Sequence, residues 1–324
     1  MRALRAFFAV LLAASLLVAL GPAARADDAN TLPAKADVGS MRHLWQSLNN
    51  CGPASVVMAL STFGIDADQE EARLALRGSD VRRGMGPGPV DPWVNQLYGL
   101  RALSRMNGTI DLIKGFVASG FAPMVTQWMQ DPSISRIAHW RTVRGYDDTQ
   151  GVFYVNDPML GANVALSYDW FLANWQAFSY RWMVIYRPSD AARVQQIVGP
   201  DWSETAMRDR FYARAKADAT AQDTSSAWLT YGEAAYQDGW FAEAVAAFER
   251  GMQLGSAAGV FTVRSSYPLA LRALGRQNDS AAAAARLANL TATPAPVAAS
   301  PDSYALFIAY VRAHQNDGVA LTEN

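Results

Sequence analysis

The stretch that most constrains this chain runs from Trp45 to Ser55, because it contains Cys51, the single cysteine among 324 residues. Gly52 and Pro53 follow the cysteine and favour a sharp turn into a helix, since proline's fixed φ and missing N–H are tolerated in the first helical turn. Apolar residues then recur at helical spacing, which predicts one buried helix face. This face comprises Val56, Val57, Leu60 and Phe63.

A thiol at the start of a helix is well placed to ionise. The unpaired N–H groups and the positive end of the helix dipole both favour thiolate, which is the nucleophilic form. The alternative is that Cys51 is a small buried core residue, as many free cysteines are. One cysteine cannot form an internal disulfide, and an unused thiol is a liability in an oxidising compartment, so its presence favours a chemical role.

The N-terminal region has the layout of a secretory signal peptide. Arg2 and Arg5 precede an uncharged apolar run, and small residues before Asp27 form a cleavage site. We therefore predict a signal peptide over residues 1–26 and a flexible leader over 27–40. The apolar run is shorter than the ~20 residues of a spanning helix, so an uncleaved anchor is the less favoured alternative. The mature protein is expected to be exported, to a periplasm or out of the cell, without a membrane span.

Charge and length limit the partners and the number of domains. The formal net charge is −1, and removal of the signal peptide removes three arginines and no acidic residue. No basic surface for nucleic acid or anionic lipid is therefore expected. The remaining length suggests two domains, which we place at residues 41–190 and 200–324.

The first of these domains has an α+β pattern, with helix signals first and strand signals afterwards. Asp147 to Gly151 is a turn sequence, so the strands on either side of it are expected to form an antiparallel hairpin. The predicted helices are 51–63, 66–76 (capped by Asp66 or Asp68), 91–100 (capped by Asp91), 109–120 (capped by Thr109) and 167–175. The predicted strands are 123–128, 139–146, 152–156 and 181–186, and residues 82–90 are a glycine- and proline-rich loop.

The second domain is predicted to be all-α. One segment has the spacing of a tetratricopeptide repeat, a helix pair of about 34 residues, and residues 267–287 repeat it weakly. Residues 291–301 are an Ala/Pro/Thr linker before a last helix at 304–311. The alternative is an alanine-rich helical bundle. Stacked helix pairs form concave surfaces, so this domain is expected to bind a protein partner or to present substrate. The repeat positions are Trp228, Tyr231, Gly232, Ala235, Ala244 and Phe248.

A cysteine nucleophile needs a base and a group that orients the base. The chain has three histidines. His43 lies in an extended segment before Cys51 and His314 lies in the helical tail, so His139, at the start of a strand, is the candidate base. A surface or hydrogen-bonded core histidine is the alternative for His139.

The expected hairpin identifies a partner for this base. If Tyr146 pairs with Val152, Asp157 is a diagonal neighbour of His139 on one sheet face, while Asn156 points to the other. A shift of one residue would exchange Asp157 and Asn156. The Asp157 carboxylate would select the imidazole tautomer and stabilise the imidazolium.

The remaining polar candidates have other predicted roles. The amide of Gln46 can donate to an oxyanion together with the backbone N–H of Cys51. Asp147 and Asp148 are expected to be solvated turn residues, too far along the strand to orient the base. Histidine and cysteine are too few for a zinc site, and no metal or cofactor is expected.

Three short motifs together resemble the bacteriocin-processing (double-glycine leader) peptidase family, a group of papain-like cysteine peptidases. The resemblance covers about residues 43–188. It implies that Gln46 forms the oxyanion hole, Cys51 is the nucleophile, His139 the base and Asp157 the orienting acid. The motifs are Gln46-x4-Cys51-Gly52-Pro53-Ala54, His139-Trp140-x4-Gly145-Tyr146 and Tyr154-Val155-Asn156-Asp157-Pro158.

The chain also departs from that family. Members that trim leader peptides are usually cytoplasmic domains fused to an exporting transporter with an ATPase, whereas this chain has a predicted signal peptide and no phosphate-binding loop. Specificity for a Gly-Gly leader is therefore not carried over. The main hypothesis is an exported papain-like cysteine peptidase acting on peptides or proteins, with a repeat-like helical domain. The alternatives are an acyltransferase or amidase with the same triad, and a peptidase-like binding protein without activity.

Overall fold

The computed structural model describes residues 32–80, 83–129, 137–255 and 261–292. The predicted signal peptide (1–26), the first residues of the expected leader (27–31) and the predicted last helix (304–311) lie outside this part of the chain. The described residues from Pro33 onward form one compact unit. Within the described residues, no helix combines the length and the apolar character that crossing a membrane requires.

The centre of the fold is an antiparallel sheet, which has seven strands in the described residues. Six strands lie in the order β2-β7-β3-β4-β5-β6, and β1 pairs with the C-terminal half of β4. The long strand β4 therefore contacts β3 through its first half and β5 and β1 through its second. The strands are β1 (Lys35–Asp37), β2 (Arg101–Arg105), β3 (Met124–Met129), β4 (Ile137–Asp147), β5 (Val152–Asp157), β6 (Gly161–Ser167) and β7 (Trp182–Tyr186).

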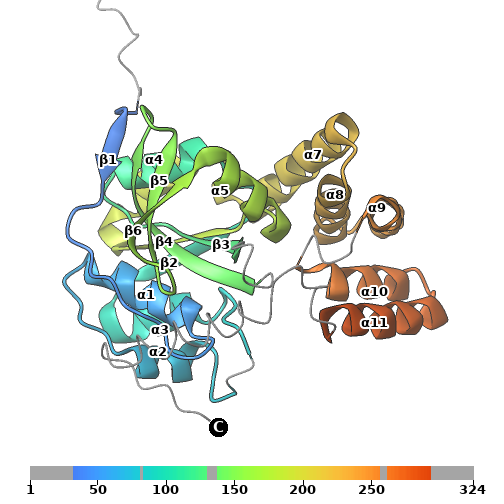
Figure 1. Ribbon diagram of the computed structural model, residues 1–324, viewed down its shortest axis with the longest axis horizontal. Helices are drawn as coiled ribbons and strands as arrows, with labels where there is room; N and C mark the ends of the chain where they lie inside the picture. Colours follow the sequence, from blue (N-terminus) through green and yellow to red (C-terminus); the bar gives the residue numbers. More distant parts are fainter. Residues whose placement is uncertain (1–31, 81–82, 130–136, 256–260, 293–324) are drawn as a thin grey trace, which may run out of the picture. The chain divides into compact units, whose positions relative to one another are not determined.

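Helices cover both faces of the sheet (Figure 1). On one face, α1 (Cys51–Ser61), α2 (Gln69–Leu76) and α3 (Val90–Tyr98) share a core with apolar residues of β3, β4 and β7. On the other face, α4 (Ile110–Ala118) and α5 (Tyr168–Trp175) contribute to a second, larger core. This arrangement confirms the α+β class that the sequence pattern predicts.

Several helix starts follow directly from local sequence. The side chains of Asp68, Thr109 and Ser167 accept hydrogen bonds from backbone N–H groups of α2, α4 and α5, as N-capping residues do. The predicted cap at Asp91 is wrong, because α3 already begins at Val90. The Asp91 carboxylate instead accepts hydrogen bonds from the Arg101 guanidinium at 2.9 and 3.0 Å. The Asp91 carboxylate thus binds Arg101, ten residues later, instead of the N–H groups at the start of the helix.

Three strands were not predicted, namely β1, β2 and β6. The expected flexible leader over residues 27–40 is therefore wrong for Lys35–Asp37, which pairs with Gly145–Asp147 of β4. β1 and β2 are short and pair with strands that are distant in the sequence, β4 and β7 respectively. β6 pairs with the adjacent β5 through an irregular register. Because strand formation depends on the neighbouring strand more than on local propensity, such segments carry little signal of their own.

The predicted hairpin of β4 and β5 is present, but its predicted register is wrong at the turn. Tyr146 pairs with Phe153, and Val152 pairs with Asp147. The turn therefore begins one residue later than the sequence pattern indicated. Such a shift alone would have exchanged the two faces of β5, because side chains alternate along a strand.

A β-bulge in β4 reverses this shift. The register changes between Val143 and Gly145, and beyond that point Val143 pairs with Val155. One extra residue in β4 thus restores the predicted register next to the site. Asp157 consequently shares a sheet face with His139, as the sequence analysis expected, although by a different route.

Helices follow the sheet. The predicted repeat segment forms the antiparallel pair α8–α9, in which Gly232 permits a close approach to the ring of Phe248. The identification of this pair as a tetratricopeptide repeat remains a prediction. The predicted linker starts too early at Thr291, because α11 extends to Ala292, and its remainder lies outside the described residues. The helices are α6 (Ala191–Val198), α7 (Glu204–Gln222), α8 (Ser225–Gln237), α9 (Phe241–Leu254), α10 (Val263–Ala273) and α11 (Gln277–Ala292), with 3-10 turns η1 (Gln176–Phe178), η2 (Pro188–Asp190) and η3 (Gly199–Trp202).

Polar contacts join these helices to the sheet-containing part. Arg214 of α7 donates to the carbonyl oxygen of Gly108 at 2.9 Å and lies over the ring of Tyr180. Asn107, which precedes α4, donates to the buried carboxylate of Asp201 at 2.9 Å. The boundary predicted between residues 190 and 200 is therefore crossed by specific hydrogen bonds, and two separate domains remain a prediction.

Candidate active site

Cys51 is the first residue of α1, and this helix packs against β4. Its side chain is buried, with 7% of the residue exposed, and the thiol is free. The helix is held against the sheet by the Thr142 hydroxyl, which donates to the carbonyl oxygen of Ser55 at 3.0 Å. The start of α1 is therefore fixed next to the beginning of β4, where His139 lies.

His139 and Asp157 form a fully buried pair. His139 lies near the start of β4 and Asp157 is the last residue of β5. The distance between His139 Nε2 and Asp157 Oδ1 is 2.8 Å, and neither residue is exposed. Since a carboxylate only accepts, Nε2 carries the proton, and in the neutral ring Nδ1 keeps its lone pair. Nδ1 is buried and has no hydrogen-bond partner of ordinary geometry among the described residues.

The Asp157 carboxylate is bound on both oxygens. Oδ1 also accepts from the backbone N–H groups of Met159 at 2.8 Å and Leu160 at 3.0 Å. Oδ2 accepts from Arg141 Nε at 2.6 Å. These contacts come from β4 and from the turn after β5, so the orientation of the carboxylate toward His139 is determined on several sides.

Arg141 is the main feature of the site that sequence reasoning missed. Its side chain is fully buried, its Nη1 donates to Gln127 Oε1 at 3.1 Å, and its guanidinium lies 5.3 Å from the centre of the Trp170 ring. Its spacing could have identified it, because Arg141 follows His139 by two residues and a strand places such residues on one face.

The contacts shift the pKa values of all three groups in the directions that a reactive thiol needs. Burial raises the pKa of the Cys51 thiol, but the adjacent His139 ring and the backbone of Trp140 and Gly52 outweigh it, so this pKa is lowered. Burial lowers the pKa of His139, and the Asp157 carboxylate outweighs it, so this pKa is raised. Burial raises the pKa of Asp157, and the charges of its two cationic neighbours hold it well below its usual range. The balance favours a thiolate–imidazolium pair.

Gln46 lies in the segment that leads into α1. Its backbone N–H donates to the carbonyl oxygen of Pro158 at 2.9 Å, which places the segment beside the turn that follows Asp157. Its side-chain oxygen is buried without a hydrogen-bond partner among the described residues. Because this oxygen has no such partner, a rotation that exchanges the two ends of the amide would place the NH2 group at the same buried position.

The other candidate residues lie elsewhere. His43 Nε2 contacts the backbone carbonyl of Asp157 at 2.8 Å, and not its carboxylate. His314 is outside the described residues. Asp147 is not solvated as predicted, because it is only 4% exposed; Thr149 and Lys35 bind it and lower its pKa to about 2. Asp148 contacts Lys114 at 2.7 Å.

The described residues contain no cluster of three or more His, Cys, Asp or Glu side chains that could hold a metal ion. The chemistry that the site can perform with its own side chains is that of a thiolate, an imidazole and a carboxylate. This set of groups can form and hydrolyse an acyl-enzyme.

Residues 36–183 match the Peptidase_C39 like family. The matched segment contains Gln46, Cys51, His139 and Asp157, and it ends before the helices that follow β7. No curated protein matches the chain.

Solved structures similar to this chain include a C39-like peptidase and two peptidases of transporters. A C39-like peptidase from Bacillus anthracis is 15% identical, covers 47% of this chain and 98% of its own, and has a TM-score of 0.39. The peptidase domain of Streptococcus ComA, a bifunctional ABC transporter of a quorum-sensing pathway, is 14% identical with coverage of 46% and 99% and a TM-score of 0.37. A double glycine motif protease from an AMS/PCAT transporter, solved with its leader peptide, is 20% identical with coverage of 47% and 94% and a TM-score of 0.36.

Proposed function

We propose that this protein is an exported cysteine peptidase that cleaves peptide bonds through Cys51, His139 and Asp157, with Gln46 as an oxyanion donor. The observation that carries the proposal is the buried hydrogen bond between His139 and Asp157, formed beside the thiol at the start of α1. The family match over the same segment supports a cysteine peptidase. The apolar N-terminal run supports export.

The first half of the reaction forms an acyl-enzyme. The Cys51 thiolate attacks the carbonyl carbon of the scissile peptide bond, and the carbonyl electron pair moves to oxygen. The backbone N–H at the start of α1 and the Gln46 amide stabilise this oxyanion. The imidazolium of His139 then gives its Nδ1 proton to the leaving nitrogen as the C–N bond breaks. A thioester and a free amine result.

The second half hydrolyses the thioester. His139, now neutral, takes a proton from water, and the hydroxide attacks the acyl carbon. The C–S bond breaks, and the thiolate and the imidazolium are restored. Asp157 keeps the ring in the tautomer that has Nδ1 free, and it stabilises the positive charge in both steps.

The proposal is tested by alkylation of the full chain with iodoacetamide across pH. Because Cys51 is the only cysteine, the label reports on this thiol alone. We expect rapid alkylation well below pH 8, and its loss in His139→Ala. His43→Ala is the matched control, since this ring contacts the backbone carbonyl of Asp157 rather than its carboxylate and otherwise packs edge-on against Trp45. A thiol that reacts no faster than free cysteine would contradict the proposal.

Peptide-library digestion then identifies the reaction. A peptidase releases two peptide fragments, and both are absent with Cys51→Ala. If added amine captures the acyl group faster than water does, the same triad acts as an acyltransferase. If the wild type binds peptides but cleaves them no faster than Cys51→Ala does, the protein is a binding protein.

A further inference from the structure

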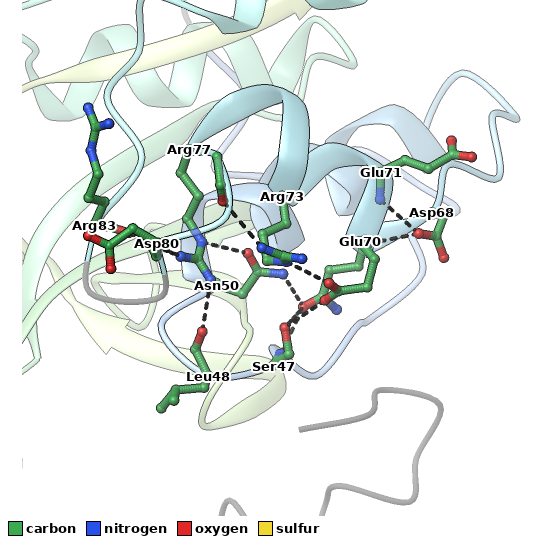
Figure 2. A network of polar contacts seen from close by, with 12 residues as sticks. Ser47, Leu48, Asn50, Asp68, Glu70, Glu71, Arg73, Arg77, Asp80 and Arg83 are labelled. Carbon is green, nitrogen blue, oxygen red and sulfur yellow. Dashed lines mark hydrogen bonds and ion pairs between the residues drawn. The ribbon is translucent and has the colours of Figure 1, made fainter. Parts of the chain in front are cut away.

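Arg77 is a buried cation next to the segment that leads into α1. It directly follows α2 and is only 6% exposed. Figure 2 shows its guanidinium between the Leu48–Asn50 segment and the residues around Asp80 and Arg83. Arginine is rarely buried unless its charge is paired, so this position calls for a physical reason.

The hydrogen bonds of Arg77 all go to neutral acceptors. Nε donates to Asn50 Oδ1 at 3.1 Å and Nη2 donates to the carbonyl oxygen of Leu48 at 3.1 Å. Nη1 donates to the carbonyl oxygens of Asp80 at 2.8 Å and Arg83 at 3.3 Å. One guanidinium thus holds both the turn before the nucleophile and the chain that follows α2 (Figure 2).

Asn50 precedes Cys51 and occupies the N-cap position of α1, yet its side chain does not cap the helix. Asparagine is among the best N-cap residues, and its oxygen normally accepts from the second or third N–H of the helix. Here the oxygen accepts from Arg77, and the NH2 group donates to Gln69 Oε1 at 2.7 Å. Both ends of the Asn50 amide are therefore held away from α1.

The first turn of α1 gains a free donor as a result. Pro53, the third helical residue, has no N–H, so Gly52 carries the N–H that a capping side chain would otherwise use. The backbone of Gly52 is one of the groups that stabilise the Cys51 thiolate. By holding Asn50 away, Arg77 leaves this donor to the sulfur.

The charge of Arg77 acts on the same group. Burial and the neighbouring Arg73 lower the pKa of Arg77, while the Cys51 thiolate, Glu70 and Asp80 oppose this shift. Glu70 is already paired with Arg73. Among the described residues, no carboxylate lies within ion-pair distance of Arg77, and the thiolate is one of three negative charges that interact with it.

We propose that Arg77 is a positioning residue for the nucleophile, which diverts the Asn50 side chain from the start of α1 and places a second positive charge beside Cys51. The proposal rests on the cysteine chemistry proposed above. Among the described residues, the charged groups near Cys51 and Arg77 include His139 and Arg141 on β4, Asp157 on β5, Arg73 and Glu70 on α2, and Asp80 and Arg83 after α2.

The test compares pH profiles of iodoacetamide alkylation for wild type, Arg77→Gln and Arg73→Gln, each as the full chain. Arg73 is the matched control, because it lies one turn earlier on α2 and binds Glu70 and the carbonyl oxygen of Gly78, whereas Arg77 binds Asn50 and Leu48 directly (Figure 2). We expect Arg77→Gln to raise the pKa of the thiol by about one unit. Arg73→Gln should keep the wild-type profile.

The shape of the profile distinguishes a change in the pKa of the thiol from a change in its accessibility, which would alter the rate by the same factor at every pH. A thiol with a higher pKa is less ionised but more nucleophilic once ionised. For a one-unit rise, alkylation of Arg77→Gln should be about three- to fourfold slower at acid pH and about threefold faster above both pKa values. The two curves therefore cross. An unfolded chain would also expose a thiol of ordinary pKa, so each variant is compared under conditions in which denaturant unfolding shows it to be folded.

Arg77→Lys provides a second variant if Arg77→Gln does not fold. Lysine keeps a cation but cannot hold Asn50 and Leu48 in one planar fork, so a smaller shift in the same direction is expected. A folded Arg77→Lys or Arg77→Gln with the wild-type profile would overturn the proposal. If instead the wild-type thiol itself shows no acid-shifted reactivity, the proposed peptidase function fails.

Discussion

Arg141 and Asp157 face each other across β4 and β5, with Arg141 Nε 2.6 Å from Asp157 Oδ2 and both side chains fully buried. The same carboxylate binds His139 through its other oxygen. Asp157 is thus shared between a permanent cation and a titratable one. The permanent cation holds the carboxylate in place, and it also reduces the negative charge that His139 experiences.

Asp157→Asn should abolish most of the reactivity of the site. The amide keeps the shape of the carboxylate but removes its charge, so the pKa of the buried His139 falls and the thiolate loses its counter-ion. We expect kcat/KM for peptide cleavage to fall by about 10²–10⁴-fold. Asp148→Asn, in the turn at the far end of the hairpin, is the control and should leave cleavage unchanged. Equal activity in both variants would contradict the assigned role.

Asp157 should also make the stability of the protein sensitive to acid. Its pKa is lower in the folded state than in the unfolded chain, where it is about 4. The carboxylate therefore stabilises the fold fully above about pH 4, and this contribution is lost as the pH falls toward the lower folded pKa. The melting temperature should fall more steeply between pH 6 and pH 2 for the wild type than for Asp157→Asn. If the melting temperatures of the two proteins fall equally with pH, another group dominates the loss of stability in acid.

Arg141→Met should shift the alkaline limit of reactivity upward. The Arg141 charge lowers the pKa of His139, so its removal leaves the imidazolium stable to higher pH. The variant should lose about 3–5 kcal/mol of unfolding free energy, because one side of the buried carboxylate becomes unpaired. The pH dependence of kcat/KM for peptide cleavage, which requires the imidazolium proton, and denaturant unfolding measure the two effects.

Gln127→Leu is the control for this prediction. It removes the hydrogen bond to Arg141 Nη1 without changing any charge. We expect a loss of about 1–3 kcal/mol and an unchanged alkaline limit. A similar shift of that limit in both variants would indicate that geometry, and not the charge of Arg141, tunes His139.

Gly52→Ala should disturb the loop that precedes α3. A Cβ at this position would lie 2.6 Å from Met85 Cβ and 2.9 Å from Met85 Cε, while the Met85 carbonyl accepts from Trp140 Nε1 at 3.1 Å. Overpacking of this kind costs about 1–3 kcal/mol. Met85→Gly in the same chain removes the clash and should restore part of the stability. Met85→Ala, which keeps the Cβ, should restore less.

Gly232→Ala tests the contact between α8 and α9. The added Cβ would lie 2.5 Å from Phe248 Cδ1, so we expect a loss of about 1–3 kcal/mol. In a double-mutant cycle with Phe248→Ala, the combined loss should be smaller than the two single losses together, since removal of the ring creates the needed space. Strict additivity, measured by urea unfolding, would contradict the close packing.

Local signals were sufficient for many elements of the fold. Asp68, Thr109 and Ser167 cap their helices through hydrogen bonds to N–H groups two or three residues away, so their effect can be read from adjacent sequence. The short runs of aromatic and β-branched residues before and after the turn at residue 148 likewise predicted the hairpin. Side-chain alternation then placed Asp157 near His139, although the turn and the bulge each shifted the register by one residue.

The sequence by itself determined the α+β pattern, the start of α1 at Cys51 and the set of candidate residues, because these depend on neighbours within a few positions. Only the tertiary structure decided which other residues hold these candidate side chains in position. Arg77 reaches Asn50 across 27 residues, and Arg141 reaches Asp157 across 16, through contacts between separate elements. Such contacts depend on how helices and strands pack in three dimensions, and an isolated arginine carries no local signal that names its partner.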